Sequence, residues 1–434
     1  MTCAGDPPAR GDVLVDEGRI VAVGKVPERL LAGGLVRVLD ASGCAVTPGL
    51  VQAHVHLCQV LFRGAADDLP LLEWLKQRIW PFEAAHDERS LSASAELGLL
   101  EMMLAGTTTI LDMGTVHHYD AVFDACARAG IRVFGGKAMM DAGPTAHIPK
   151  GLRESTKSSL RESDTLRETW SGKGDGRLGY AYAPRFILSC TEALFRATAE
   201  RSEATGALLH SHVAEHPDER AVVRKALGDD DLAILRRWGF KGPRTLLAHG
   251  VQVRDDEADA LAKDGTRIVH CPSANLKLGS GIARVHDLDA RGVQLALGAD
   301  GAPCNNNLDP WTELRHAALL AKVRTSTTAL PARRAFHLAT IDGARALGVS
   351  EITGSLEAGK RADVVVIRTD GPHVEPCGDV YSRLVYACTA RDVEHVLVDG
   401  AIVVKNGEHQ RLDRDAVLGR ARSEAKKLTA RAKI

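Results

Sequence analysis

The chain has 434 residues, with 55 Lys and Arg against 56 Asp and Glu and therefore a net charge of -1. Its 45% hydrophobic and 26% charged residues are typical of a globular enzyme with one large and one smaller domain. This balance argues against a nucleic-acid or membrane partner, no apolar run is long enough to span a bilayer, and the N-terminus has none of the features of a secretory signal.

Both ends of the chain are predicted to form small antiparallel structure. Residues 12–47 and 360–408 contain short strands that are separated by Gly or Asp turns and show no helical period. The simplest arrangement is one composite β-sandwich domain made from residues 1–47 and 351–411. The charged segment 412–434 is predicted to be a helical tail.

Between these ends, short β-branched runs alternate with amphipathic segments, several of which end in Gly, a common helix stop. Eight such strand–helix units with right-handed crossovers close into a barrel, so residues 48–350 are predicted to form a (β/α)8 TIM barrel. The stretch 142–177 should contain at least one helix, and its start is expected to form a loop over the barrel mouth. The eight runs are TPGLVQAHVH (47–56), TTTILDM (107–113), IRVFGGKAMMD (131–141), LGYAYAP (178–184), ALLHSHV (207–213), RTLLAHG (244–250), TRIVHCP (266–272) and VQLALGAD (293–300).

Polar residues at the ends of these runs are the candidate site, because catalytic groups of such barrels lie at the C-terminal ends of the strands. The first run ends in His54 and His56, whose i, i+2 spacing puts both imidazoles on the face that lines the barrel interior. His212 stands near the end of the fifth run and Asp300 at the end of the eighth. Three imidazoles and one carboxylate suit a single divalent cation, with a coordination position left for water.

Any one histidine, taken alone, is more simply explained as a core or surface residue. The recurrence of such residues at successive strand ends, including His249 at the end of the sixth run, favours the metal site. His210 faces the same side as His212 but lies deeper, and is predicted to pack behind the ligands. The nine cysteines are scattered and form no CxxC pair, which argues against a disulfide framework or a cysteine zinc site and favours a reducing compartment, the cytoplasm.

Five segments carry a family resemblance: PGLVQAHVHL, HVAEHPDE, LLAHG, HCPSANLKLGSGIA and LGADGAPCNNNLDPWTELR. In order and spacing they resemble the cytosine deaminase-like branch of the amidohydrolase superfamily, which includes guanine deaminase, the S-adenosylhomocysteine/methylthioadenosine deaminases and the s-triazine hydrolases. The resemblance covers nearly the whole chain. It implies that His54, His56, His212 and Asp300 bind one Zn²⁺, with Fe²⁺ as the alternative. The fourth run, LGYAYAP, contains no Lys that could be carboxylated to bridge two metals, so a mononuclear site is favoured.

The chemistry that the resemblance implies is hydrolytic deamination of a purine-type ring. The cation would lower the pKa of a bound water toward ~7. Asp300 would accept the proton of this water, and His249 would stabilise the tetrahedral adduct. Glu215, three residues after His212, would protonate the ring nitrogen beside the attacked carbon and then the departing ammonia. Glu219, one helical turn further on, is expected to be a solvated helix residue.

The predicted pocket residues give two different indications of the substrate. Trp74 and Glu83 occupy the positions at which adenosine-type deaminases contact the nucleoside, with the Glu on the ribose hydroxyls. Gln59 and the pair Arg185-Phe186 resemble guanine deaminase, in which Gln and Arg hold the purine edge. Spacing alone explains Trp74 and Glu83 equally well as a packing residue and an exposed charge. Guanine-like and adenosine-type substrates (5'-deoxyadenosine, methylthioadenosine, S-adenosylhomocysteine) therefore both stay open.

Two other functions are weighed against deamination. The first is hydrolysis of a chlorinated s-triazine, but such relatives tend to lose the acid/base Glu or the His–Asp pair, whereas Glu215, His249 and Asp300 are all present here. The second is a catalytically inactive barrel that serves as an assembly module, which is disfavoured because no metal ligand is missing. The expected partner is a small heterocyclic molecule, and assembly into a homo-oligomer stays open.

Overall fold

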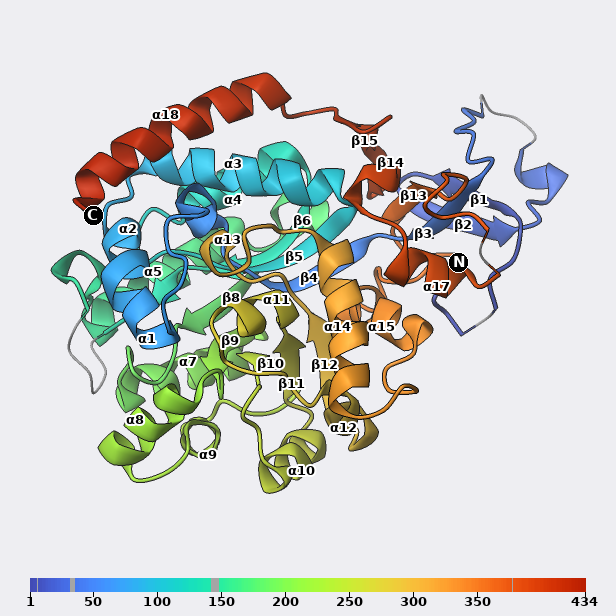
Figure 1. Cartoon of the computed structure of the whole chain (residues 1–434). Helices are drawn as coiled ribbons and strands as arrows, with labels where there is room; N and C mark the ends of the chain where they lie inside the picture. Colours follow the sequence, from blue (N-terminus) through green and yellow to red (C-terminus); the bar gives the residue numbers. More distant parts are fainter. Residues whose placement is uncertain (6, 32–35, 142–147, 377) are drawn as a thin grey trace.

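A parallel barrel forms the centre of the molecule in the computed structural model, which describes residues 1–5, 7–31, 36–141, 148–376 and 378–434 (Figure 1). Its strands are neighbours in the order β4, β5, β6, β8, β9, β10, β11 and β12. The ring closes between the first and the last of them, where Val55 bridges Asp300 and the Asp300 N–H donates to the carbonyl of His54 at 3.0 Å. The strands are β4 (Leu50–Val55), β5 (Thr107–Met113), β6 (Arg132–Gly136), β8 (Leu178–Pro184), β9 (Leu208–Val213), β10 (Thr245–His249), β11 (Arg267–His270) and β12 (Gln294–Leu297), and the short β7 (Ala138–Met139) also pairs with β8. Each of the eight predicted runs contains one barrel strand, so the predicted (β/α)8 barrel is confirmed.

Helices connect the strands and cover the outer face of the barrel (Figure 1). Several end as the sequence predicts: α4 and α10 are followed by Gly130 and Gly265, whose φ angles of 85° and 74° are left-handed and therefore suit glycine. The covering helices are α3 (Glu88–Leu104), α4 (Asp120–Ala129), α5 (Thr156–Trp170), α7 (Glu192–Thr205), α8 (Pro217–Leu227), α9 (Asp231–Arg237), α10 (Asp255–Asp264), α12 (Val285–Ala290), α14 (Pro310–Arg324), α15 (Ala332–Leu338) and α16 (Ile341–Ala346).

Short helices follow several strands at the carboxyl ends of the barrel, and those after β4 supply residues to the site. After β4 come η2 (Leu57–Phe62), α1 (Leu71–Trp74), η3 (Leu75–Ile79) and α2 (Trp80–Ala84). After β11 and β12 come α11 (Pro272–Lys277) and α13 (Ala302–Asn305). The stretch 142–177 contains η4 (Lys150–Leu152), the expected helix α5, and α6 (Lys173–Gly176), whereas the start of that stretch, residues 142–147, lies outside the described residues.

The two ends of the chain meet in antiparallel structure beside the barrel (Figure 1). One sheet has the order β16 (Glu408–His409), β15 (Ala401–Lys405), β14 (Val393–Val398), β13 (Val364–Arg368) and β3 (Cys44–Pro48). The N-terminal strands β1 (Asp12–Asp16) and β2 (Arg19–Gly24) form a separate hairpin. Ile20 of this hairpin packs in a small apolar cluster with Leu356, Ala362 and Val364. The antiparallel domain predicted from both ends of the chain is therefore present, as a sheet and a hairpin with a shared core.

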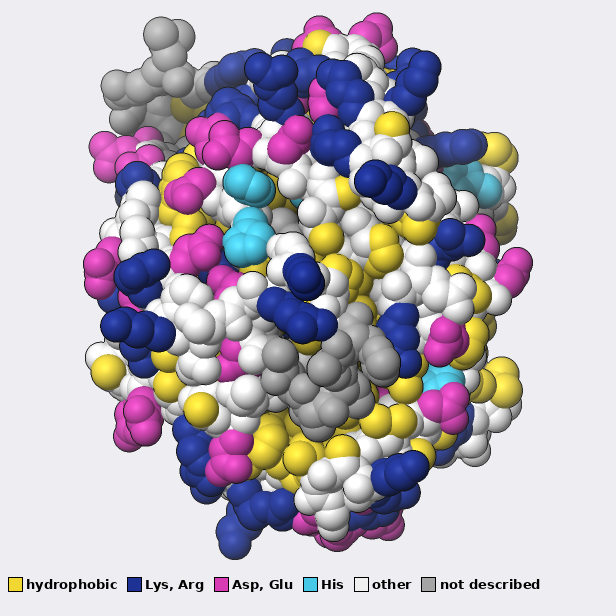
Figure 2. All heavy atoms as spheres, turned by 90° about the vertical axis from the view of Figure 1, so that its left-hand side faces the viewer, with side chains coloured by type: hydrophobic (Ala, Val, Ile, Leu, Met, Phe, Trp, Pro, Cys, Tyr) yellow, Lys and Arg dark blue, Asp and Glu magenta, His cyan; other side chains and the backbone are white. Residues whose placement is uncertain are grey.

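The helical tail is α18 (Arg414–Ala432), which lies along α3 and reaches back to the segment after β4 (Figure 1). Arg420 pairs with Glu96 at 2.6 Å, and Arg431 donates to the carbonyl of Ala85 at 2.8 Å. Lys and Arg side chains gather at the top of the molecule over this helix, whereas both signs of charge are mixed over the rest of the same face (Figure 2). The remaining helix, α17 (Val380–Tyr386), packs against α14 and α15. Among the described residues, no helix is long and apolar enough to cross a membrane.

Candidate active site

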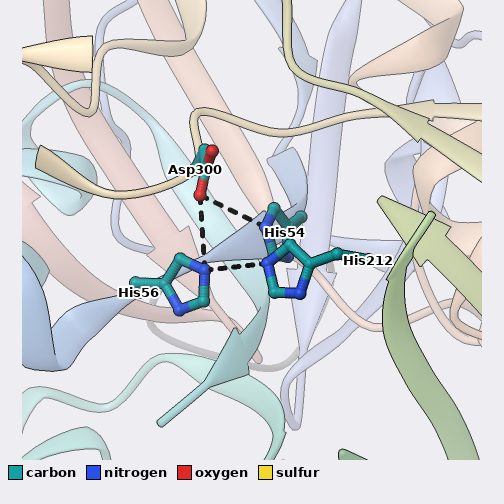
Figure 3. A group of neighbouring side chains, drawn as sticks. All are labelled: His54, His56, His212 and Asp300. Atoms are coloured by element: carbon teal, nitrogen blue, oxygen red, sulfur yellow. Dashed lines mark hydrogen bonds and ion pairs between the residues drawn. The ribbon is translucent and has the colours of Figure 1, made fainter. Parts of the chain in front are cut away.

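Three imidazoles and one carboxylate converge at the carboxyl end of the barrel (Figure 3). His54 and His56 come from the end of β4, His212 from β9 and Asp300 from the segment that leaves β12. All four side chains are buried, and one ligand atom of each lies within 4.8 Å of those of the other three. Asp300 Oδ1 is 3.3 Å from the Nε2 atoms of both His54 and His56, and the Nε2 atoms of His56 and His212 are 3.3 Å apart. The four residues predicted to bind a metal are thus brought together.

The hydrogen bonds of the two imidazoles from β4 and β9 decide which ring nitrogen carries the proton. His56 Nδ1 lies 2.7 Å from the carbonyl oxygen of Met113, and His212 Nδ1 lies 2.7 Å from that of Arg185. A carbonyl oxygen only accepts, so both Nδ1 atoms donate, and each Nε2 of the neutral rings carries a lone pair. Two lone pairs therefore face each other between these rings, an arrangement that needs a cation between them.

His54 reaches the same state through a second histidine. His210 Nδ1 donates to the carbonyl of Leu246 at 3.0 Å, which leaves its Nε2 as an acceptor for His54 Nδ1 at 2.8 Å. His54 Nε2 therefore also carries a lone pair, and this buried atom has no hydrogen-bond partner among the described residues. His210 has the place predicted for it, behind the ligands, where it orients one of them.

The donor set fits one divalent metal. Ligands at 2.0–2.1 Å from a tetrahedral Zn²⁺ are about 3.3 Å apart, which matches the nitrogen–oxygen and nitrogen–nitrogen distances of the cluster. Burial holds the pKa values of His54, His56 and His212 well below the usual range, so these rings stay neutral. Burial works to raise the pKa of Asp300, but the neighbouring imidazoles, His249 first, lower it below its ordinary value. Neutral imidazoles and an ionised carboxylate are the protonation states that bind a cation.

Two further titratable groups stand beside the cluster. His249, the last residue of β10, points its Nε2 at Glu215 Oε2 (3.5 Å) and at Asp300 Oδ2 (3.9 Å). Its other nitrogen lies 2.9 Å from Asn275 Oδ1 in α11. Burial, and then the charge of Asp300, raises the pKa of Glu215 well above its ordinary value, which favours the protonated form of this carboxyl. Asn275 is not among the predicted site residues, although it lies within the segment HCPSANLKLGSGIA that carries the resemblance.

A cavity next to the cluster is lined by four of the five predicted substrate-binding residues: Gln59, Trp74, Arg185 and Phe186. Its lining also includes His249, Glu215 and Asp300. Glu83 is not part of the lining: its side chain is buried behind Arg185 and Gln59, accepting from Arg185 Nη1 at 2.6 Å and from Gln59 Nε2 at 2.8 Å. The exposed charge that spacing allowed for Glu83 is therefore absent, and Glu83 fixes the two polar residues of the pocket wall.

The Gln59 amide is oriented by this contact. Because its NH₂ donates to Glu83, its Oε1 remains as an acceptor, and this buried oxygen has no hydrogen-bond partner in the described part of the chain. Gly301 makes room for it, since a Cβ at that position would lie 2.0 Å from Gln59 Oε1. Among the described residues, Gln59 Oε1 is thus an unpaired acceptor buried against Gly301, whereas the guanidinium of Arg185 lines the pocket and is paired with Glu83.

One expectation about the neighbouring helix is wrong. Glu219, expected to be a solvated residue of α8, is 0% exposed, because the first turn of α8 packs this side chain toward the barrel. Helical spacing alone could not reveal this, since it does not say which face of the helix turns inward.

A parallel barrel with such a cluster at its strand ends, next to a buried acid, defines a metal-dependent barrel hydrolase. The chain belongs to the amidohydrolase family, whose model matches residues 45–403. The 5'-deoxyadenosine deaminase of Methanothermobacter thermautotrophicus is 39% identical to it over 421 residues, which cover 97% of this chain and 95% of the relative.

Two solved structures extend the comparison. An adenosine deaminase from Xanthomonas campestris with bound zinc has a TM-score of 0.90 and 32% identity, covering 96% of this chain and 93% of the other. E. coli guanine deaminase has a TM-score of 0.82 and 28% identity, covering 91% and 92%. These findings confirm the predicted family and fold, and the zinc of the first structure supports a single divalent metal as cofactor.

Proposed function

We propose that the chain is a metal-dependent aminohydrolase that removes the exocyclic amine of a purine-type ring as ammonia. The observation that carries this proposal is the presence of Glu215, a buried acid with a raised pKa, in a cavity that His56, His212 and Asp300 of the cluster also line. A metal centre alone would serve many hydrolyses, but loss of an amine needs a proton donor beside it. The deaminases among its relatives support the same reading.

Three titratable residues of the cavity, Asp300, His249 and Glu215, have parts in this reaction. The cluster of His54, His56, His212 and Asp300 would hold a divalent metal, which would lower the pKa of a bound water and so provide the nucleophile. Asp300 faces the imidazole ligands with Oδ1 and His249 with Oδ2, so Oδ2 is placed to take the water proton. His249, held by Asn275, is placed to stabilise the charge that develops in the transition state. Glu215 would give its proton to the ring nitrogen beside the attacked carbon, and the proton taken from the water would then pass through Glu215 to the exocyclic amine, which leaves as neutral ammonia.

Two observations bear on the choice between an adenosine-type and a guanine-like substrate, and they favour different ones. The 39% identical relative acts, by its name, on 5'-deoxyadenosine, which supports an adenosine-type substrate. The guanidinium of Arg185 in the pocket lining supports a guanine-like one, because a guanine edge offers this donor a carbonyl oxygen that an adenine ring lacks. Glu83 accepts from Arg185 and Gln59, so it could bind ribose hydroxyls only if its buried ion pair with Arg185 were broken. We therefore place guanine-like rings first and adenosine-type nucleosides second.

The proposal also covers the domain organisation, the class of partner and the cellular location. We propose residues 48–350 as the catalytic barrel, residues 1–47 with 351–411 as the composite domain and residues 412–434 as a helical tail. The net charge of -1 and the narrow buried site support a small heterocyclic substrate and no nucleic-acid partner. The free state of the described cysteines supports a cytoplasmic location.

The test is an ammonia-release assay of the metal-loaded protein on guanine, 5'-deoxyadenosine, methylthioadenosine and S-adenosylhomocysteine, with chloride release from a chlorotriazine as a further arm. Ammonia from a purine is expected. Chloride release without ammonia would replace the proposal by a triazine hydrolase, and metal-loaded protein that is inert on all of these would favour the inactive module. The variant Arg185→His should lower the ratio of guanine to deoxyadenosine turnover; an unchanged ratio would remove Arg185 from the ring edge.

A further inference from the structure

The backbone turn that presents Glu215 is held by two carboxyl groups from neighbouring helices. The turn leaves β9 through Ala214, whose φ of 48° lies in the left-handed region that a residue with a Cβ rarely adopts. The Ala214 N–H donates to Asp231 Oδ2 at 2.5 Å, and the Glu215 N–H donates to Glu219 Oε2 at 3.3 Å. Two successive amides of a strained turn are thus each captured by an acid.

The two acids have different surroundings. Asp231 lies 3.2 Å from Arg220 Nε and accepts a second amide, that of Leu232, so a negative charge on it is compensated. Glu219 has no basic partner within 4.0 Å among the described residues, and its Oε1 is buried without a hydrogen-bond partner there. Burial, and then the charges of Asp231 and Glu215, raises the pKa of Glu219 well above its ordinary value. Burial also raises the pKa of Asp231, but Arg220 and the amides of Ala214 and Leu232 oppose that rise, so a negative charge is better compensated on Asp231 than on Glu219.

We propose that Glu219 is a positioning residue of the deamination reaction, holding the Glu215 backbone in the strained turn so that the Glu215 carboxyl faces His249 and the cavity. The proposal rests on the proposed function of Glu215 as proton donor. Glu219 belongs to the first turn of α8 and accepts from the Glu215 N–H, so it ties the backbone of the turn to this helix.

The alternative is a purely structural role, in which Glu219 is a first-turn acid that stabilises the N-terminus of α8. Such an acid is normally exposed, as the neighbouring Asp218 is, with a side chain that is 72% exposed. An acid at this third helical position ordinarily bonds the N–H of the N-cap, which is His216 here. Glu219 is instead buried and accepts from the N–H of Glu215, one residue before the N-cap. Stabilisation of the helix terminus therefore does not explain its position.

The experiment compares Glu219→Ala, Glu219→Gln and the matched control Asp218→Asn in the metal-loaded protein. Gln keeps an oxygen acceptor for the Glu215 amide and is uncharged, so its kcat should stay within about threefold of the parent. Ala removes the acceptor, so kcat should fall at least about tenfold while KM changes less than about twofold and metal content is unchanged. The control should equal the parent. A Glu219→Ala protein with parental kcat would overturn the proposal, and so would a Glu219→Gln protein as slow as Glu219→Ala.

A second readout needs no substrate and so separates this proposal from the proposed function. Hydrogen exchange of the peptide around Glu215 should be about tenfold faster in Glu219→Ala than in the parent, and unchanged in Glu219→Gln. Equal exchange in all three proteins would overturn the positioning role even if deamination is observed. If Glu219→Ala does not fold, Glu219→Gln decides: parental kcat and exchange support the proposal, and loss of either refutes it. If hydrogen exchange is faster in Glu219→Ala but the parent protein is inert on every purine, the proposed function is refuted, whereas the role of Glu219 in holding the turn is still supported.

Discussion

Replacing Glu83 by Ala tests the view that this residue is the buried counter-ion of the pocket wall. In the structure its two oxygens accept from Arg185 at 2.6 Å and from Gln59 at 2.8 Å, and the side chains of Glu83 and Arg185 are 0% and 3% exposed. Removing one partner of a buried ion pair leaves the other charge uncompensated and costs about 3–5 kcal/mol. We expect Glu83→Ala to lower the free energy of unfolding by this amount, measured from urea midpoints by tryptophan fluorescence.

The chain offers matched controls for this change. Glu73 lies on the same segment, but its side chain is 48% exposed and 3.9 Å from Lys76, so Glu73→Ala should cost less than about 1 kcal/mol. The paired variant Glu83→Leu with Arg185→Leu leaves no lone buried charge and should recover most of the loss. A loss for Glu83→Ala as small as that for Glu73→Ala would refute the reasoning. Activity gives a second discrimination: a counter-ion role raises KM for bases and nucleosides alike, whereas a ribose contact would affect nucleosides alone.

Three further predictions concern the cluster and its surroundings. Glu215→Gln should keep one metal per chain and lose about 10²–10⁴-fold in kcat, because it removes a proton carrier and no ligand; parental kcat would exclude that role. His212→Ala should lose the metal, whereas His210→Ala, which only orients His54 at 2.8 Å, should weaken metal affinity by about 10–100-fold in a chelator competition; equal affinities would contradict the division into ligand and support. Burial lowers the pKa of His270 to about 3 from an ordinary value of 6.5. As the pH falls, His270 is therefore protonated in the unfolded chain at a higher pH than in the folded chain. Between pH 7 and pH 5, the protonation of His270 should therefore lower the free energy of unfolding of the parent by about 2 kcal/mol. In urea titrations at both pH values, the free energy of unfolding of His270→Asn should fall by about 2 kcal/mol less than that of the parent.

The sequence predicts the fold and the cluster well because both follow from local patterns. A period of two at His54 and His56, the end of a β-branched run at Asp300 and the alternation of strands with helices are all readable within about ten residues. Contacts between distant segments are different. Glu83 and Arg185 are 102 residues apart, and nothing in either segment says that the two side chains meet. Glu219 shows the same limit at short range, because the inward face of α8 is set by packing on the barrel.

The arrangement of protons links the metal cluster to the rest of the barrel. Each imidazole ligand presents its Nε2 lone pair only because its Nδ1 is committed elsewhere: His56 to the carbonyl of Met113, His212 to that of Arg185, and His54 to His210. The carbonyl of Arg185 orients a metal ligand while its guanidinium forms the pocket wall. A backbone shift at Arg185 would therefore disturb metal binding and substrate recognition together, whereas a change of its side chain alone should disturb recognition only. The ratio of metal content to turnover in Arg185→His separates the two: full metal content with altered substrate preference is the result that this geometry requires.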